Sequence, residues 1–276
     1  MKGSLMTPAD IKAIADFIRQ RTDFKPDYGM ILGSGLGVMA EEAENATVIP
    51  YSEIPNFPQS TAPGHAGNMV LGELAGKKVV MMQGRFHTYE GYSQQEVSLP
   101  VAVMHELGIH TLITTCASGG LNYNFKAGDI MVIRDHINFT SSNPLIGPND
   151  DSVGARFPVM FDAYTPALRE VAHKVALEQN YRLHEGVYCS INGPVFFTPA
   201  ELRMLMKWGT DSIGMSIVPE VIRAVHRGLK VLGLALISDM AIPDTGEHAT
   251  GEEVLKVVQE SSKTFKALVR GIMEQI

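Results

Sequence analysis

Short apolar runs alternate along the chain with segments in which apolar residues recur every three or four positions. Seven runs have the length of strands: 28–33, 79–84, 111–117, 129–137, 185–192, 211–216 and 230–239. The last of them, KVLGLALISD, is the most apolar, which is typical of a central strand that is buried on both faces. The pattern therefore predicts a sheet whose centre lies at 230–239.

Three helices carry their own start signals. Thr7 and Thr198 each precede a proline and stand three residues before Asp10 and Glu201, which is the pattern of a capping box with proline at the first helical position. A third helix begins with TGEE at 250–253, and apolar residues follow it at helical spacing up to the end of the chain. Strands that alternate with helices, with no linker or repeat between them, predict one α/β domain over residues 1–276, with a mixed central β-sheet flanked by helices.

The loop after the first strand, within ILGSGLGVMAEEA at 31–43, has glycine at positions 33, 35 and 37. Glycine allows positive φ angles and lets a ligand approach the main chain. A dinucleotide is one candidate, because the loop follows a strand and Glu53 lies about twenty residues farther on, the usual distance to the ribose-binding acid. However, Val38 stands where the third glycine of that fingerprint belongs, and Pro55 and Pro58 disfavour a second parallel strand. The spacing therefore favours a smaller ligand.

Three later stretches, PGHAG at 63–67, QGRFHTYEGY at 83–92 and TTCASGGL at 114–121, again place glycine beside groups that bind anions. Ser34 offers a hydroxyl, Arg85 a guanidinium fork, the third stretch its backbone N–H groups, and His65 and His87 ring nitrogens. Each residue taken singly also has an ordinary explanation in a turn, a surface ion pair or a structural histidine. Together these loops predict a site for a free tetrahedral oxyanion.

Composition narrows the class of protein. The 276 residues are 45% hydrophobic and 19% charged, with a net charge of -7 and no basic face, so we expect no nucleic-acid partner. Cys116 and Cys189 form no CxxC pattern, which suits a reducing compartment and predicts neither a disulfide framework nor a metal site. No apolar run reaches membrane length. We therefore expect a soluble, cytoplasmic protein without a membrane partner.

From about residue 28 to residue 256 the sequence resembles the trimeric purine nucleoside phosphorylases, a family that includes the methylthioadenosine phosphorylases. The motifs that carry the resemblance are LGSGLG, EIPNFP.ST.PGHAG, MQGRFH.YEGY, GDIMVIRDHIN, NPLIGPND, RFPVMFDAY, GMSIVPEV and the strand that ends in ISD. So many motifs in one order are specific. The resemblance implies that the glycine loop is one wall of a site for inorganic phosphate, which would be a co-substrate, with no cofactor and no metal.

The resemblance also implies roles for individual residues. Phosphate would be bound by Ser34, His65, Arg85, His87, Ser216 and the backbone at Ala117. The nucleoside would be bound by Tyr89, Met215, Phe196, Phe197, Ser238, Asp239 and Gly251, with His87 and Asp239 as catalytic groups. Phe157 would reach the ribose pocket of a neighbouring subunit and thereby require a homotrimer. Without the resemblance, Phe157 and Phe196 would equally suit ordinary core packing, and Met215 would suit core packing better.

Three departures from the 6-oxopurine enzymes of the family concern the base and the sugar. Phe197 stands where those enzymes have a glutamate, Ser238-Asp239 replaces Thr-Asn or Ser-Asn, and Gly251 replaces a histidine for which His248 is a possible substitute. An aspartate can accept a hydrogen bond from a 6-amino group and, when protonated, donate one to N7, while Gly251 leaves room at the sugar 5′ position. The ordinary alternatives are that Phe197 turns away, that Gly251 suits a helix start, and that Asp239 caps a loop.

The leading hypothesis is phosphorolysis of a purine nucleoside to free base and (deoxy)ribose 1-phosphate, with 6-aminopurine nucleosides such as adenosine accepted. The alternatives within the family are a methylthioadenosine phosphorylase and a strict phosphorylase of the 6-oxopurines inosine and guanosine. Two hypotheses from other classes are an NAD-dependent oxidoreductase and a nucleoside-binding protein that has lost turnover. A further difference, Cys116 in place of an asparagine, predicts a structural buried thiol.

Overall fold

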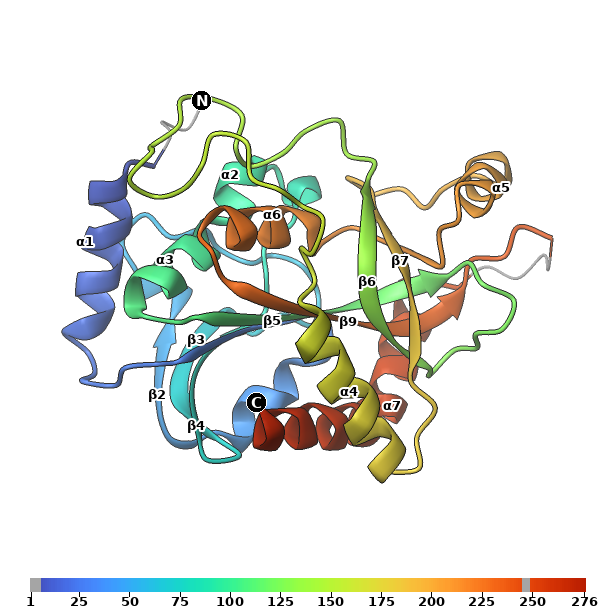
Figure 1. Ribbon diagram of the computed structural model, residues 1–276, viewed down its shortest axis with the longest axis horizontal. Coiled ribbons are helices and arrows are strands. Elements are labelled where there is room, and N and C mark those ends of the chain that lie inside the picture. Colours follow the sequence, from blue (N-terminus) through green and yellow to red (C-terminus); the bar gives the residue numbers. More distant parts are fainter. Residues whose placement is uncertain (1–5, 245–248) are drawn as a thin grey trace.

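The computed structural model of the protein describes residues 6–244 and 249–276 (Figure 1). Within these ranges nine strands form one sheet in the order β2-β3-β4-β1-β5-β8-β7-β6-β9. The strands are β1 (Tyr28–Leu32), β2 (Glu44–Pro50), β3 (Asn68–Leu74), β4 (Lys77–Gln83), β5 (Thr111–Gly120), β6 (Ile130–Asn138), β7 (His184–Ser190), β8 (Ser212–Gly214) and β9 (Lys230–Met240).

The sheet is mixed, and one part of it closes on itself. Strand β5 pairs with both β8 and β9, so β5, β8, β7, β6 and β9 form a closed ring of strands. Strands β4, β1, β5 and β9 are mutually parallel, whereas β3 runs antiparallel to both of its neighbours, β2 and β4. Because the carboxyl ends of parallel strands meet at one edge of a sheet, the loops after β1, β4, β5 and β9 gather at the same edge.

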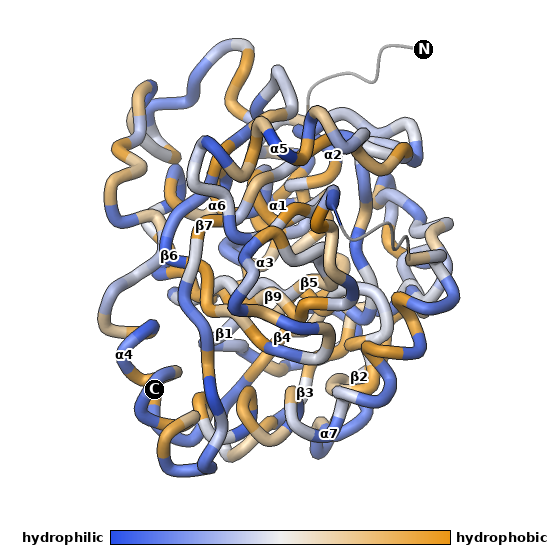
Figure 2. Tube along the Cα trace, turned by 90° about the vertical axis from the view of Figure 1, so that its right-hand side faces the viewer, coloured by the Kyte–Doolittle hydropathy of each residue, from blue (hydrophilic) through white to orange (hydrophobic). Residues whose placement is uncertain are grey.

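Helices cover both faces of this sheet (Figure 1). The α-helices are α1 (Pro8–Arg19), α2 (Gln94–Val97), α3 (Leu99–Leu107), α4 (Pro166–Glu178), α5 (Pro199–Lys207), α6 (Val218–His226) and α7 (Gly251–Gln275), and the 3-10 helices are η1 (Gly37–Glu42), η2 (Tyr51–Glu53) and η3 (Thr88–Glu90). Helices α1, α3 and α6 lie on one side, and α4 and α7 pack together on the other. Figure 2 shows the hydrophobic stretches gathered in the interior around β5 and β9.

Each helix layer encloses its own apolar core. On one side, Ile14 and Ile18 of α1 pack in the same cluster as Val103 of α3. On the other side, Val175 of α4 and Leu268 of α7 belong to a second cluster. Full burial of an aliphatic side chain of this size contributes about 1.5–3 kcal/mol. The two layers hold the sheet between them and fix the edge at which its loops meet.

Most of the predicted elements are confirmed. All seven predicted strands are present within one to three residues, and β9 is buried over eight consecutive positions. The predicted helix starts at Thr7, Thr198 and Thr250 are confirmed, and each of these threonines forms a capping box. The sequence reading omitted β2 and β3, as well as helices α2, α3, α4 and α6. Strand β2 lies at the sheet edge and is largely exposed, and α3 is buried almost all round, so neither has the periodicity that identifies an element.

The fold argues against the dinucleotide hypothesis. After β1 the chain forms only the 3-10 helix η1, and the following strand β2 pairs antiparallel with β3. A dinucleotide-binding unit needs a helix that opens directly after the glycine loop and crosses to a parallel neighbouring strand. The single α/β domain predicted from the sequence therefore holds, and the NAD-dependent alternative lacks its structural unit.

Candidate active site

A cavity of about 410 Å³ opens at the edge where β1, β4, β5 and β9 end. Its lining includes twelve of the residues that the sequence assigned to a site: Ser34, Arg85, His87, Tyr89, Ala117, Phe196, Phe197, Met215, Ser216, Ser238, Asp239 and Gly251. Two further residues, Ser118 and Cys116, also line the cavity. The sequence did not predict a role there for Ser118, and it predicted only a structural buried thiol for Cys116. The polar groups gather toward the strand ends, and aromatic and aliphatic side chains form much of the remaining wall.

The glycines of the first loop serve close packing of the protein on itself. A Cβ atom at Gly33 would lie 2.8 Å from the Cys116 Cα atom, and one at Gly35 would lie 2.8 Å from the Val258 side chain. Gly35 also has a φ of 72°, which favours glycine. These glycines let the loop approach β5 and α7 closely, which places the Ser34 hydroxyl at the cavity. Their direct neighbours are therefore β5 and α7, and they shape the site indirectly.

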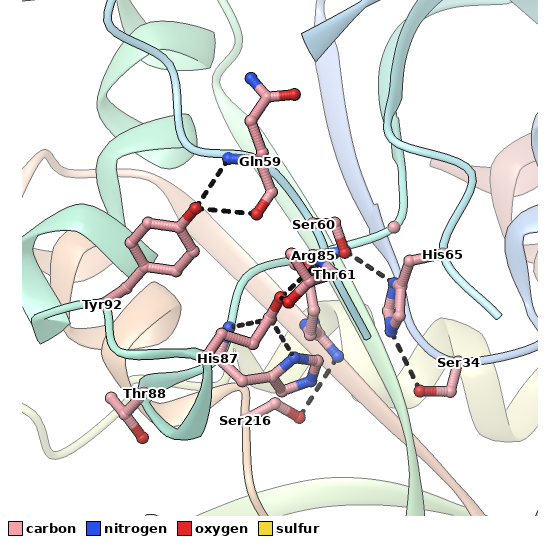
Figure 3. A network of polar contacts seen from close by, with 12 residues as sticks. Ser34, Gln59, Ser60, Thr61, His65, Arg85, His87, Thr88, Tyr92 and Ser216 are labelled. Atoms are coloured by element: carbon pink, nitrogen blue, oxygen red, sulfur yellow. Dashed lines mark hydrogen bonds and ion pairs between the residues drawn. The ribbon is translucent and has the colours of Figure 1, made fainter. Parts of the chain in front are cut away.

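His65 is held in one tautomer by two neighbours. The Arg85 backbone N–H donates to Nδ1 at 2.9 Å, so Nε2 carries the proton and faces the Ser34 Oγ atom at 3.1 Å (Figure 3). Burial, with smaller contributions from His87 and Arg85, lowers the pKa of His65 to about 3. His65 is therefore a neutral donor beside the cavity, one contact away from Ser34, and lies behind the cavity wall.

The Arg85 guanidinium is fully engaged by protein groups. Its Nε and Nη2 atoms donate to the two carboxylate oxygens of Glu220, each at 2.9 Å, and Nη2 also donates to Thr114 Oγ1 at 2.8 Å. Its Nη1 donates to the Thr115 carbonyl and, at 3.3 Å, to Ser216 Oγ (Figure 3). Burial, the largest single influence, lowers the pKa of Arg85, but the charge and hydrogen bond of Glu220 together with Cys116 and Tyr188 raise it above the ordinary value.

This geometry corrects one expectation. A guanidinium fork suits a phosphate, and the sequence suggested that role for Arg85. In the structure the fork holds Glu220, and Nη1 is the part directed at Ser216 on the cavity wall. Sequence reasoning missed Glu220, although it lies in the quoted stretch GMSIVPEV, and helix α6, in whose first turn it lies, was not predicted either.

His87 is oriented by Glu90. Its Nδ1 and its backbone N–H both lie within 2.9 Å of the Glu90 Oε1 atom, while Oε2 accepts from the backbone and the hydroxyl of Thr61 at 2.7 Å. Burial would raise the pKa of Glu90, but these hydrogen bonds lower it to about 2. Burial lowers the pKa of His87, and its ring stacks on Tyr89 with centroids 4.6 Å apart. The site therefore has a neutral imidazole backed by a carboxylate.

Asp239 reaches the cavity because strand β9 bulges. The pairing with β5 shifts between Ser118 and Gly119, which puts Ser118 opposite Ile237 and Gly119 opposite Asp239. The bulge interrupts the alternation of side chains, so Ser238 and Asp239 both line the cavity. Ser238 Oγ lies 2.8 Å from Asp239 Oδ1 and 3.2 Å from the Ser118 carbonyl oxygen. Burial raises the pKa of Asp239, and the Ser238 hydrogen bond opposes it.

The rest of the predicted nucleoside wall is apolar and partly open. Phe196 is 68% exposed and borders the cavity, and Phe197 packs edge-on against Phe139 with ring centroids 6.0 Å apart. Among the residues that the structure describes, none has an atom within 4 Å of a Cβ atom at Gly251. His248, the suggested substitute at the sugar 5′ end, lies outside the described residues.

Phe157 lies away from the cavity of its own chain. It is 83% exposed, and Val159 and Phe161 nearby are 77% and 95% exposed. This places three large apolar side chains on one exposed surface segment. The role assigned to Phe157, completion of a neighbour's pocket, concerns an assembly of several chains and stays a prediction.

Two further features of residues 6–244 and 249–276 concern membrane-spanning helices and clusters of metal-binding side chains. In this part of the chain every helix is too short or too polar to cross a membrane. The same residues include no group of three or more histidine, cysteine, aspartate or glutamate side chains arranged to hold a metal ion. Cys116 and Cys189 are both buried free thiols, and burial raises the pKa of each to about 12, which leaves the thiols protonated.

Comparison with known proteins agrees with this geometry. Residues 27–274 match the phosphorylase superfamily. The chain is 49% identical to purine nucleoside phosphorylase 1 of Geobacillus stearothermophilus, over 98% of this chain and 99% of that protein, and 47% identical to the Mus musculus purine nucleoside phosphorylase, over 98% and 96%. A crystal structure of the Schistosoma mansoni purine nucleoside phosphorylase in complex with adenosine superposes with a TM-score of 0.94 at 40% identity, covering 98% of each chain. The chain therefore belongs to the phosphorylase superfamily, and within it to the purine nucleoside phosphorylase family.

Proposed function

We propose that this protein catalyses the phosphorolysis of purine nucleosides to free base and (deoxy)ribose 1-phosphate. The observation that carries the proposal is the arrangement of one cavity: Ser34, Arg85, His87 and Ser216 gather anion-binding groups in it, and Asp239 lines it from a separate strand. Inorganic phosphate is the co-substrate, and no other cofactor is needed. The chemistry follows from what each group donates or accepts.

The protein groups at the phosphate position bind an anion that is also the nucleophile of the reaction. Ser34 and Ser216 offer hydroxyls, and the neutral His65 offers an N–H behind Ser34. Because His87 Nδ1 donates to Glu90, the Nε2 atom of the neutral ring is an acceptor and suits the hydroxyl of monohydrogen phosphate. The site thus binds phosphate through directed hydrogen bonds and keeps much of its negative charge available to the sugar.

The reaction needs charge stabilisation at both ends of the breaking bond. As the N9–C1′ bond breaks, positive charge grows on the sugar and negative charge on the base, and a phosphate oxygen forms the new bond to C1′. Asp239, which burial tends to keep protonated, donates its proton to N7, and the electron pair of the broken bond stays on the base. Asp239 then recovers a proton from water when the base leaves.

We infer that 6-aminopurine nucleosides such as adenosine are substrates. The Asp239 carboxyl accepts from a 6-amino group and, when protonated, donates to N7, whereas the neighbouring Phe197 leaves no partner for a 2-amino group or an N1–H. No described residue comes within 4 Å of a Cβ atom at Gly251, which favours tolerance of a 5′-methylthio group, so methylthioadenosine is the second candidate substrate. A strict 6-oxopurine specificity fits less well, because a charged Asp239 would oppose a 6-oxo group.

We also propose a homotrimer in which Phe157 enters the ribose pocket of a neighbouring subunit. The support is the family resemblance together with the exposure of Phe157, Val159 and Phe161. Removing such a segment from water on assembly is favourable by roughly 25 cal/mol per Å² of apolar surface. The cytoplasmic location stays a prediction, in keeping with the two free thiols.

The test is a phosphorolysis panel without added cofactor. Adenosine, inosine, guanosine and 5′-methylthioadenosine are each incubated with the protein, with and without inorganic phosphate, and the released base is quantified. We expect release that depends on phosphate, with adenosine among the substrates and equimolar sugar 1-phosphate formed. Binding of nucleosides without release of base would instead identify a nucleoside-binding protein, and release at the same rate without phosphate would identify a hydrolase.

A further inference from the structure

We propose that Glu220 is a positioning residue for the phosphate co-substrate: it holds the Arg85 guanidinium so that one N–H of Nη1 faces the phosphate, and its charge prevents Arg85 from neutralising that phosphate. The inference rests on the proposed phosphorolysis, since it concerns the anion site of that reaction. Glu220 itself does not line the cavity and acts through Arg85.

Glu220 holds the Arg85 guanidinium in one fixed position. Glu220 is the third residue of α6, is 1% exposed, and receives Arg85 Nε and Nη2 on separate carboxylate oxygens. Thr114 Oγ1 donates to the same carboxylate at 2.5 Å and accepts from Arg85 Nη2, which closes the network. Two parallel charge-assisted bonds fix the plane of a guanidinium as well as its position. Arg85 therefore has little freedom to turn its fork toward the cavity.

One Arg85 hydrogen bond is much weaker than the rest. The other hydrogen bonds of the guanidinium are 2.9 Å or shorter, whereas Nη1 and Ser216 Oγ are 3.3 Å apart. Ser216 lines the cavity, so this N–H is the one that an incoming phosphate oxygen can take over. Arg85 is then a one-point donor to the phosphate.

A strained turn fixes both sides of Arg85 at once. Ile217, the residue between Ser216 and α6, has φ 66° and ψ -57°, and the Val218 N–H donates to the Ser216 carbonyl at 2.8 Å. This is the positive-φ γ-turn, which is rare and especially unfavourable for a β-branched residue. The turn keeps Ser216 Oγ on the cavity side of Arg85 and Glu220 on the other side. Strain of this kind is characteristic of functional sites.

The charges around the phosphate position explain why pairing Arg85 with Glu220 matters for the reaction. Arg85 is the one arginine or lysine among the described residues that line the cavity, and Glu220 compensates it. His65 is neutral, and His87 stands beside the ionised Glu90. These protein groups around the phosphate position thus supply no net positive charge. The negative charge of the bound phosphate therefore remains available to stabilise the positive charge that develops on the sugar. A free Arg85 fork would stabilise phosphate in the ground state and lose that differential effect.

Glu220→Gln separates this role from a structural one. The amide is isosteric but neutral, so we expect inorganic phosphate alone to bind at least threefold more tightly by calorimetry, while kcat for adenosine falls at least tenfold and the KM for adenosine changes less than twofold. Loss of structure would lower the melting temperature and the active fraction without tightening phosphate binding. The matched control is Glu185→Gln on β7, the same change at an ion pair with Arg169 of α4, which should leave the phosphate Kd and kcat unchanged.

Glu220→Asp provides the second variant, and it keeps the test decisive if the glutamine variant does not fold. It retains the charge but shortens the reach by one methylene, so the phosphate Kd should stay within threefold of wild type while kcat falls. The proposal is overturned if Glu220→Gln leaves phosphate binding unchanged or weaker, if it retains wild-type kcat, or if Glu220→Asp tightens phosphate binding. Base release by the wild-type protein tests phosphorolysis separately, because the phosphate titrations contain no nucleoside.

Discussion

Asp239→Asn is the sharpest test of how the base is recognised. The carboxyl of Asp239 lies in the cavity with Oδ1 at 2.8 Å from Ser238 Oγ, and burial favours its protonated form. In that form one oxygen donates to N7 of the purine and the other accepts from a 6-amino group. The asparagine amide still matches adenosine, because its NH₂ group donates to N7 while its carbonyl oxygen accepts from the 6-amino group. It also matches a 6-oxopurine, because the same NH₂ group can serve N7 and the 6-oxo oxygen together, where a carboxyl oxygen of Asp239 would face that oxygen.

The size of the effect follows from one buried hydrogen bond. A buried donor or acceptor left without a partner costs about 1–3 kcal/mol, and each 1.4 kcal/mol is a factor of ten. Asparagine keeps a match for adenosine and removes the oxygen–oxygen conflict that the carboxyl has with inosine, so the ratio of kcat/KM for adenosine to that for inosine should fall by roughly 5- to 150-fold. The bulge that brings Ser238 and Asp239 to the cavity involves the backbone alone, so the substitution should leave it in place.

The assay is a pair of initial-rate series, with adenosine and with inosine, at saturating phosphate. Ser238→Ala is the matched comparison, because it removes the hydrogen bond to Asp239 but keeps the carboxyl group. Its ratio of kcat/KM for adenosine to that for inosine should stay closer to the wild-type ratio than to that of Asp239→Asn. An equal loss for both substrates in Asp239→Asn, or an unchanged ratio, would refute the assignment of Asp239 to the base and move specificity elsewhere in the cavity.

Three further predictions address stability, the phosphate wall and assembly. Burial raises the pKa of Asp239 above 3.8 in the folded state, so the folded protein binds that proton more tightly than the unfolded chain. This contribution to the stability of the wild-type protein is lost as the pH rises through the folded-state pKa. The melting temperature of Asp239→Asn relative to wild type should therefore increase between pH 4 and pH 8. Gly84→Ala, at φ 117° with a Cβ atom 2.8 Å from His65 Cβ, should cost more than about 1 kcal/mol in chemical denaturation and raise the phosphate KM, and an unchanged phosphate KM would remove His65 from the site. Phe157→Ala should change the stability of the chain by less than about 0.5 kcal/mol but raise the nucleoside KM, and full wild-type activity in a demonstrably monomeric sample would contradict the shared pocket.

The sequence was sufficient to place most candidate site residues because each follows a strand end. Ser34 comes two residues after β1, Arg85 two after β4, and Asp239 stands near the end of β9. Loops at the carboxyl edge of a sheet of parallel strands converge whatever their exact length, so strand ends that can be recognised from apolar runs already predict a common site. The family motifs then assigned a role to each position.

The sequence by itself determined where helices α1, α5 and α7 begin and that the segment of β9 is buried. Thr7, Thr198 and Thr250 form their capping boxes from residues three positions apart, and such local hydrogen bonds do not depend on the rest of the fold. The continuous apolar run of β9 likewise specifies burial on both faces in any sheet that includes it.

Only the tertiary structure decided what the site groups do. The partner of Arg85 is Glu220, 135 positions farther along the chain, and a fork that suits phosphate suits a carboxylate equally well, so residue type could not distinguish them. The bulge at Ser118 and Gly119 depends on the register between β5 and β9, which local sequence does not specify. The physical reason is the same in both cases: the choice among chemically equivalent partners depends on distances between segments far apart in sequence, and those distances exist only once the sheet has closed.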